Sequence, residues 1–404
     1  MQTWSSVEVP NLDLAIPTPR IFDSKTQDLK ELRIDSDCTI YVCGITPYDA
    51  THLGHAATYV AFDTLIRIWT AAGSKVKYVQ NVTDIDDPLL ERAALLNRDW
   101  QDIAQEQTNL FKSDMEALRV IPPANYIGAV ESIPLVVEQI KQLAKSDATY
   151  ELAGDIYYPI AKSELAGKIA HLSRDEMIEI FSARGGDPAR VGKHDPLDAL
   201  LWKHERPGDP SWPTEIGAGR PGWHIECAAI ALKYLGQTID VQGGGSDLKF
   251  PHHEMSAAHA QSATHKTFAR NYVHTGMVAL NGEKMSKSLG NLVFVSKLRA
   301  SGVDPMAIRL AILANHYRSD WEWSDEKLTS AQDRLNNWRA AFKHDMAAPE
   351  VSLQIADALS QDLNTPSALA VIDDWAKRTL TSKNSDLDSN QIMKQTVDAL
   401  LGVI

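Results

Sequence analysis

Two short segments, far apart along the chain, carry the side chains best suited to holding phosphate. The first is His52-Leu53-Gly54-His55, at the start of a predicted helix, and the second is Lys284-Met285-Ser286-Lys287-Ser288, after a predicted hairpin turn. Imidazoles at a helix N-terminus lie where the partial positive charge of the helix favours anions. Two ammonium groups on one loop can reach a polyphosphate, with serine hydroxyls as further donors. Together the segments predict a site that stabilises the charge on a reacting triphosphate.

Taken singly, each segment has an ordinary explanation. Two histidines can cap a core helix, and two lysines can form a solvated pair. Their combination in one chain favours His52, His55, Lys284 and Lys287 as catalytic residues. Glycines on either side of the lysine segment are expected to act as hinges when the loop closes over a nucleotide.

The elements around the first segment predict a nucleotide-binding α/β fold. Residues 39–43 are expected to form a buried strand, residues 54–72 a helix and residues 75–80 a second strand. Residues 84–88 provide a cap and first turn for the next helix. Strands that alternate with helices imply a parallel sheet.

Further along, prolines and glycines interrupt this alternation between residues 120 and 220. The alternation resumes with a predicted helix at 223–235, a strand at 239–241, a glycine loop and a helix after Pro251. Asn281-Gly282 predicts a tight hairpin turn. Later helices are expected at 305–315, 325–345 and 366–380. We therefore predict four segments: the first half of a catalytic core (1–120), an insertion (121–220), the second half of the core with the lysine loop (221–302) and a helical C-terminal domain (303–404).

Composition limits the class of protein. The chain has 404 residues, 44% hydrophobic and 23% charged, enough for two linked domains. Its apolar runs are shorter than the ~20 residues that span a bilayer, and its N-terminus does not resemble a secretory signal. Three cysteines argue against a disulfide framework and for a reducing compartment. We expect a cytoplasmic protein without a membrane role, and the net charge of −13 disfavours a broad nucleic-acid-binding face.

The histidine and lysine segments, in this order, are similar to the signature pair of class I aminoacyl-tRNA synthetases. Residues 43–49 (CGITPYD), 243–248 (GGGSDL) and 250–254 (FPHHE) resemble the cysteinyl branch. Within that branch the whole chain resembles the ligases of mycothiol biosynthesis, which join cysteine to glucosaminyl-inositol. The resemblance implies an α/β fold with a Rossmann-like catalytic core and parallel sheet, a connective insertion and a C-terminal helical domain.

The resemblance also implies a metal site formed by Cys43, Cys227 and His252. Two thiolates neutralise Zn²⁺ formally, and three protein ligands leave one tetrahedral position for the thiolate of a cysteine substrate. Such a site rejects serine without an editing domain. Taken alone, buried cysteines are more often inert small hydrophobes, which remains our interpretation of Cys38.

Substrate contacts are implied position by position. Contacts with the cysteinyl end would come from Cys43, Gly44, Ile45 and Thr46, and contacts with its carboxylate or phosphate from Thr58, Asn81, Val82 and Thr83. Trp223 would line the side-chain pocket. The ribose would be contacted by Gly245, Ser246 and Asp247, and the adenine by Val278. Core packing is a close alternative for Trp223.

Some positions depart from the related patterns. Ser256 stands where the tRNA synthetases have a glutamate after the zinc histidine, which favours three protein ligands. Ala183 precedes the segment 184–188, whose role is left unassigned. His224-Ile225-Glu226 fits the first element of zinc deaminases, but their P-C-x-x-C element does not accompany it.

The close relatives within this family differ in the molecule that accepts the activated cysteine. Residues 331–404 hold 7 Lys or Arg against 10 Asp or Glu, which disfavours a tRNA-gripping tail. We therefore predict an AMP-forming ligase with L-cysteine, Mg-ATP and glucosaminyl-inositol as substrates, one Zn²⁺ per chain, no nucleic-acid partner and a monomeric state. The alternatives are a shortened synthetase-like enzyme that charges tRNA or another carrier, and a catalytically silent zinc-binding regulator.

Overall fold

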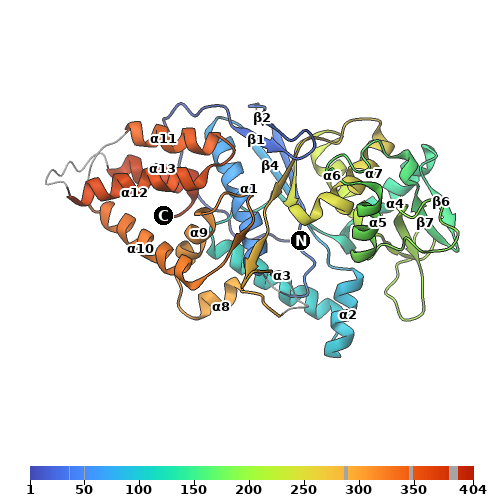
Figure 1. Cartoon of the computed structure of the whole chain (residues 1–404). Helices are drawn as coiled ribbons and strands as arrows, with labels where there is room; N and C mark the ends of the chain where they lie inside the picture. The colour runs from blue at the N-terminus through green and yellow to red at the C-terminus, as the bar shows by residue number, and fades with distance from the viewer. Residues whose placement is uncertain (36, 50, 286–289, 345–348, 382–389) are drawn as a thin grey trace.

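A five-stranded parallel sheet forms the centre of the computed structural model (Figure 1). The structure describes all residues except 36, 50, 286–289, 345–348 and 382–389. The strands run across the sheet in the order β11 (Ala269–Thr275), β10 (Ile239–Gly245), β3 (Cys38–Val42), β4 (Val76–Val82) and β5 (Asn125–Gly128). The strand order reverses between β3 and β10, and ligands of such sheets bind at the carboxyl ends of the strands at this point. The predicted α/β core with a parallel sheet is confirmed.

Helix α1 (Leu53–Ala71) connects β3 to β4 and is buried along most of its length. Its bounds differ by one residue from the predicted 54–72, and β4 extends two residues beyond the predicted strand. Asp86 caps α2 (Asp87–Leu96), as the prediction of a cap in residues 84–88 requires. Helix α3 (Trp100–Ala117) then leads towards β5.

Two local predictions differ from the structure. The glycine run 243–245 was predicted as a loop, but it continues β10, which is hydrogen-bonded to strands on both sides. Gly243 is needed because a Cβ there would lie 2.4 Å from the ring of Phe62 on α1. The segment 121–220, predicted as an insertion between the two halves of the core, contributes β5 to the central sheet, where β5 pairs with β4. Strand β5 is short and follows Pro122-Pro123, so neither length nor pattern identified it.

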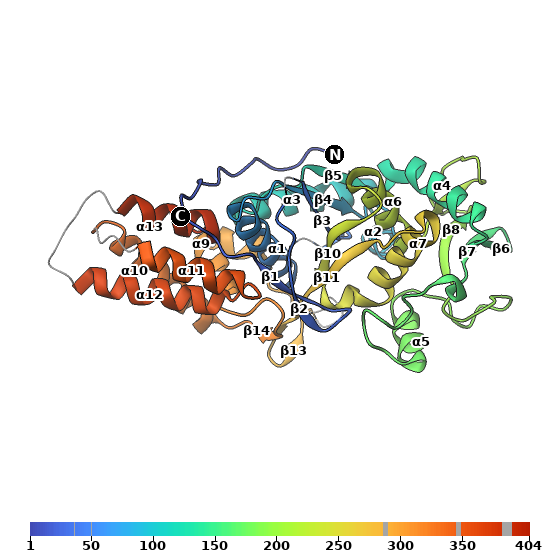
Figure 2. The same cartoon turned by 90° about the horizontal axis from the view of Figure 1, so that it is seen from above.

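The rest of the insertion forms an antiparallel sheet on one side of the core (Figure 2). Its elements are α4 (Ala129–Lys145), β6 (Tyr150–Leu152), β7 (Asp155–Tyr158), α5 (Arg174–Ala183), β8 (Ala199–His204) and β9 (Gly219–Pro221). Asp187, from the unassigned segment 184–188, accepts hydrogen bonds from the Tyr157 hydroxyl and the Lys193 ammonium group. Those contacts give the segment a structural role inside the insertion.

Helices α6 (Trp223–Leu235) and α7 (Glu254–Thr264) return the chain to the core, and α6 has the predicted bounds. The predicted hairpin turn at Asn281-Gly282 joins β12 (Val278–Leu280) to β13 (Glu283–Lys284), with positive φ angles at both turn residues. On the side opposite the insertion lie α8 (Val295–Ala300), α9 (Pro305–Leu313), β14 (Trp321–Glu322), α10 (Asp325–Ala341), α11 (Pro349–Ser360), α12 (Thr365–Thr381) and α13 (Asn390–Leu401). Helix α10 is shorter than the predicted 325–345.

An N-terminal hairpin of β1 (Arg20–Asp23) and β2 (Asp28–Glu31) lies against β11, where Ser24 N–H donates to the Tyr272 carbonyl. The hairpin also contacts the helical region, through Arg20 and Phe22. Within the described part of the chain, none of the helices is both long and apolar enough to span a membrane.

Candidate active site

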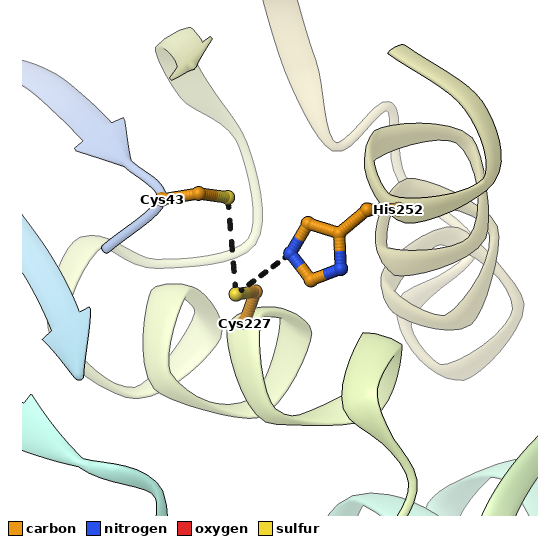
Figure 3. A group of neighbouring side chains, drawn as sticks. All are labelled: Cys43, Cys227 and His252. Carbon is orange, nitrogen blue, oxygen red and sulfur yellow. Dashed lines mark hydrogen bonds between the residues drawn. The ribbon is translucent and has the colours of Figure 1, made fainter. Parts of the chain in front are cut away.

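Three electron-pair donors from three elements meet at the carboxyl ends of the central strands (Figure 3). Cys43 follows β3, Cys227 lies on α6 and His252 precedes α7. Their ligand atoms all lie within 4.8 Å of one another, and all three side chains are buried. The two sulfur atoms are 3.8 Å apart, and Cys227 Sγ is 3.2 Å from His252 Nε2. We call these three residues the donor cluster.

The chemistry of the donor cluster fits a soft divalent cation. Burial raises the pKa of the Cys43 thiol, and the neighbouring Cys227 raises it further. Burial also acts to raise the pKa of Cys227, but its contacts with Cys43 and His252 lower it on balance. Two thiolates side by side in this buried pocket would require a positive charge, and the largest influences on the pKa values of Cys43 and Cys227 include no lysine or arginine. Zn²⁺ prefers this set of two thiolates and one imidazole, with a fourth position open.

A chain of histidines, which the sequence analysis did not identify, extends from the donor cluster. Cys43 Sγ lies 3.1 Å from His253 Nε2, and His253 Nδ1 lies 2.8 Å from His274 Nε2. His274 Nδ1 in turn lies 2.8 Å from the Ser24 hydroxyl. Groups of this kind orient metal ligands and tune their basicity. The pair His252-His253 within one buried segment was the available signal in the sequence.

Trp223, the predicted side-chain-pocket residue, lies at the donor cluster. Its ring stacks on His252 at a centroid distance of 4.4 Å and an interplanar angle of 26°. His224 Nδ1 lies 3.2 Å from His252 Nδ1. Burial, with His252 nearby, holds the pKa of His224 well below its usual value, so His224 is neutral at physiological pH. The aromatic and imidazole rings thus fix the orientation of His252.

The segment 43–46, predicted to contact the cysteinyl end, follows β3 and lies beside 81–83, predicted to contact the carboxylate or phosphate, at the end of β4. Gly44 N–H donates to Asn81 Oδ1 at 2.8 Å, and Thr83 N–H donates to the Ile45 carbonyl at 3.0 Å. A Cβ on Gly44 would lie 1.6 Å from the Asn81 carbonyl oxygen, so only glycine fits this approach. Both segments are therefore held at the same edge as the donor cluster.

The predicted phosphate histidines lie at the start of α1. His52 is the N-cap, and its Nδ1 accepts from Gly54 N–H at 3.1 Å. The rings of His52 and His55 stack at a centroid distance of 3.8 Å. One turn later, the hydroxyls of Thr58 and Thr275 are 2.9 Å apart, which ties α1 to the end of β11. This arrangement gives the N-terminus of a buried helix two imidazoles at its mouth.

The chain is hydrogen-bonded to the core both before and after the lysine segment. On the entry side, the backbone of Lys284 pairs with Ala279, and Met285 N–H donates to the Val278 carbonyl at 3.1 Å. On the exit side, Leu53 N–H donates to the Val293 carbonyl at 2.9 Å, and Val295 N–H donates to the Thr51 carbonyl at 3.1 Å. The exit therefore bonds directly to the histidine segment. The predicted catalytic residue Lys287, with Ser286 and Ser288, lies outside the described residues.

The predicted ribose and adenine residues follow neighbouring strands. Gly245 ends β10 opposite Thr275, and Ser246 and Asp247 form a short 3-10 turn behind it. Val278 is buried at the start of β12. The predicted site residues within the described chain thus line one edge of the sheet, from the donor cluster to β12.

Comparisons with known proteins identify the family. Residues 30–333 match the family described as tRNA synthetases class I (C) catalytic domain. The chain belongs to this family. Two curated relatives, from Thermomonospora curvata and Acidothermus cellulolyticus, are each 54% identical and align over 100% of both chains. Both are named L-cysteine:1D-myo-inositol 2-amino-2-deoxy-alpha-D-glucopyranoside ligase. The predicted resemblance to class I synthetases and to these ligases is confirmed.

Solved structures confirm the class I synthetase fold. Mycobacterium tuberculosis methionyl-tRNA synthetase in complex with methionyl-adenylate matches with a TM-score of 0.63 and 15% identity, covering 91% of this class I chain and 89% of the other. An arginyl-tRNA synthetase of Campylobacter jejuni, described as putative, matches with a TM-score of 0.56 over 92% of each chain. At such low identity these likenesses support the fold alone.

Proposed function

We propose that this protein is an ATP-dependent ligase that joins L-cysteine to the amine of glucosaminyl-inositol and releases AMP and pyrophosphate. The acceptor is the one that the names of the full-length relatives state. The single observation that carries the choice of cysteine is the donor cluster beside Trp223, at the point where the strand order reverses. A soft metal position can select a thiol from other small amino acids.

In this proposal Cys43, Cys227 and His252 hold Zn²⁺, which supplies a coordination position for the substrate thiolate. Trp223 packs against His252 and closes the side-chain pocket. Serine lacks a readily ionised sulfur, so it would leave the position poorly filled. Selection then occurs during binding.

The cysteine carboxylate attacks the α-phosphorus of Mg-ATP. The bond from this phosphorus to the bridging oxygen breaks, and pyrophosphate leaves with that oxygen. His52 and His55, at the mouth of α1, and Lys284 and Lys287 stabilise the charge that develops on the phosphates. The direct hydrogen bonds between 51–53 and 293–295 support a joint action of the two segments.

The amine of glucosaminyl-inositol then attacks the carbonyl carbon of cysteinyl-adenylate. The carbon–oxygen bond to phosphate breaks, AMP leaves, and the amine loses a proton as the amide forms. The predicted cytoplasmic location, monomeric state and absence of a nucleic-acid partner belong to the same proposal.

Mass spectrometry of matched reactions tests the proposal. The protein, cysteine and Mg-ATP are incubated with glucosaminyl-inositol in one tube and with cysteine tRNA in the other. We expect the amide and an equal amount of AMP in the first tube only. Charged tRNA would instead identify a shortened synthetase, and the absence of any cysteine-dependent pyrophosphate release would identify a silent paralogue.

A further inference from the structure

A carboxylate of the helical C-terminal region faces the catalytic core. Asp362 lies in the turn between α11 and α12, is only 5% exposed, and has a positive φ angle, as does Leu363. Asp362 N–H donates to the Arg20 carbonyl at 3.0 Å. The turn therefore directs this carboxylate towards the N-terminal hairpin and away from the helices that flank it.

The Asp362 carboxylate joins two separate segments. Its Oδ1 accepts from Phe22 N–H at 3.0 Å and from the Tyr317 hydroxyl at 2.8 Å. Its Oδ2 accepts from Arg318 Nε at 2.5 Å, and the Arg318 guanidinium lies over the Phe22 ring. Burial and the nearby Asp362 raise the pKa of Tyr317, so its hydroxyl stays protonated and donates. Asp362 thereby holds Tyr317 and Arg318, near the start of residues 316–323, which we call the support loop.

The support loop holds the backbone that leads into β12. Gly276 N–H donates to the Tyr317 carbonyl at 2.8 Å, and Met277 N–H donates to Asp320 Oδ1 at 2.7 Å. In return, Trp321 N–H donates to the Met277 carbonyl at 3.0 Å. Backbone groups of residues 276–277 and of the support loop are thus hydrogen-bonded to each other, so β12 cannot shift without the support loop.

The same strand carries the predicted adenine contact and the entry to the lysine segment. Trp323 N–H donates to the Ala279 carbonyl at 2.9 Å, next to Val278. Gly282 N–H, at the tip of the hairpin, donates to Glu322 Oε1 at 2.8 Å. A displacement of the support loop would therefore move both the adenine side of the site and the hairpin before Lys284.

We propose that Asp362 is a positioning residue for ATP, which acts through the support loop to hold β12 and the lysine hairpin in their reactive arrangement. This inference rests on the proposed function, because it assumes that β12 and the lysine segment bind the nucleotide. The three ligand residues of the donor cluster lie on other elements, namely β3, α6 and the segment before α7. Their link to the N-terminal hairpin runs through His253 and His274 to the Ser24 hydroxyl, whereas Asp362 accepts from the Phe22 N–H. We therefore expect cysteine binding and metal content to be retained when Asp362 is changed.

The substitution Asp362→Asn tests the inference. The amide keeps the size of the carboxylate but has one oxygen, so an N–H group must face either Arg318 Nε or the Phe22 and Tyr317 donors. In cysteine-dependent ATP–pyrophosphate exchange, kcat/KM for ATP should fall on the order of 100-fold, the effect of a displacement of about 1 Å. KM for cysteine and zinc content should not change.

Asp373→Asn is the matched control. Asp373 also lies in the helical region and accepts from an arginine, Arg334, and from an aromatic N–H group, that of Trp338. We expect Asp373→Asn to lower the melting temperature without changing KM for ATP. Tyr317→Phe, which removes one donor to Asp362 and keeps the carbonyl that Gly276 uses, should weaken ATP use in the same direction by a smaller factor.

Equal changes in KM for ATP and for cysteine in Asp362→Asn, or behaviour matching that of Asp373→Asn, would overturn the inference. Binding of ATP is also measured by calorimetry, without cysteine or acceptor. If the wild type proves to use a different amino acid or acceptor, weaker ATP binding by Asp362→Asn and Tyr317→Phe still supports the positioning role. Unchanged ATP binding in both variants contradicts it.

Discussion

Two buried polar clusters lie at different points of the core, and they differ in how their charges are balanced. In the ion cluster, formed by Asp63, Arg67 and Arg309, all three side chains are fully buried. Arg67 Nε donates to Asp63 at 2.7 Å, and Arg309 also pairs with Asp63. Although burial opposes it, Arg309 and Arg67 hold the pKa of Asp63 below its usual value. The donor cluster, equally buried, gathers two thiols and an imidazole around one point.

The difference separates a structural cluster from a binding site. Both guanidinium groups in the ion cluster also donate to backbone carbonyls near the end of α13, at Ala399 and Leu401. In the ion cluster the hydrogen-bond donors of the two guanidinium groups are thus paired with carboxylate and carbonyl acceptors. The ion cluster thereby joins α1 and α9 to the last helix. In the donor cluster, electron-pair donors face one another. Buried electron-pair donors that are not balanced by a positively charged side chain indicate a position for a cation.

The largest expected effect tests the donor cluster directly. Cys227→Ala removes one thiolate and the charge balance for Zn²⁺, so we expect both metal content and selection of cysteine to be lost. Cysteine-dependent pyrophosphate exchange should fall about 10⁴-fold, the selectivity of a site whose specific contact is missing. Metal analysis and exchange are measured on the same sample.

Cys38→Ala is the control, because Cys38 is also fully buried but lies outside the donor cluster and contacts the Arg33 carbonyl. It should retain both metal and exchange activity. A Cys227→Ala protein that keeps zinc and normal exchange would remove Cys227 from the site and leave the cluster without a function.

A change in the ion cluster should affect folding and leave the chemistry intact. Asp63→Asn leaves two buried guanidinium groups without a carboxylate, so the free energy of unfolding should fall by about 3–5 kcal/mol. Urea unfolding at neutral pH measures this loss. The folded variant should bind zinc with the wild-type stoichiometry, because the donor cluster lies on other side chains.

For comparison, Asp374→Asn breaks an exposed pair with Arg378 and should change the free energy of unfolding by less than about 1 kcal/mol. Similar losses in the two variants would mean that burial does not distinguish the ion cluster. Loss of zinc in folded Asp63→Asn would mean that the two clusters are coupled.

The two clusters also show which parts of the structure the sequence could predict. The core strands, the caps and the bounds of α6 follow from periodicity and turn residues, which are local signals. Asp63 and Arg67, four residues apart in an apolar helix, were a local signal of a buried pair, but Arg309 comes from another helix. The edge strand β5 lacks a pattern of its own, because its place depends on pairing with β4.

The candidate site is less accessible to local reasoning. Cys43, Cys227 and His252 were grouped through a family resemblance, since their spacing alone does not bring them together. His274 and Ser24 were not identified, because their contacts with the donor cluster run through His253 and depend on three separate elements. The same applies to the bonds from residues 51–53 to residues 293–295. Long-range pairing of this kind is set by the tertiary fold.

A smaller effect than the loss of a cluster residue is expected at His253, whose Nε2 contacts the Cys43 sulfur and whose Nδ1 contacts His274. His253→Gln keeps an N–H donor near the Nε2 position facing Cys43, whereas His253→Asn keeps only a polar group near the Nδ1 position, towards His274. Groups that orient metal ligands contribute roughly 10–100-fold in affinity. We therefore expect His253→Asn to bind zinc about 10–100-fold more weakly in chelator competition, and His253→Gln to remain close to the wild type. Equal losses in both variants would show that ring packing, and not the hydrogen bond to the thiolate, determines the contribution of His253.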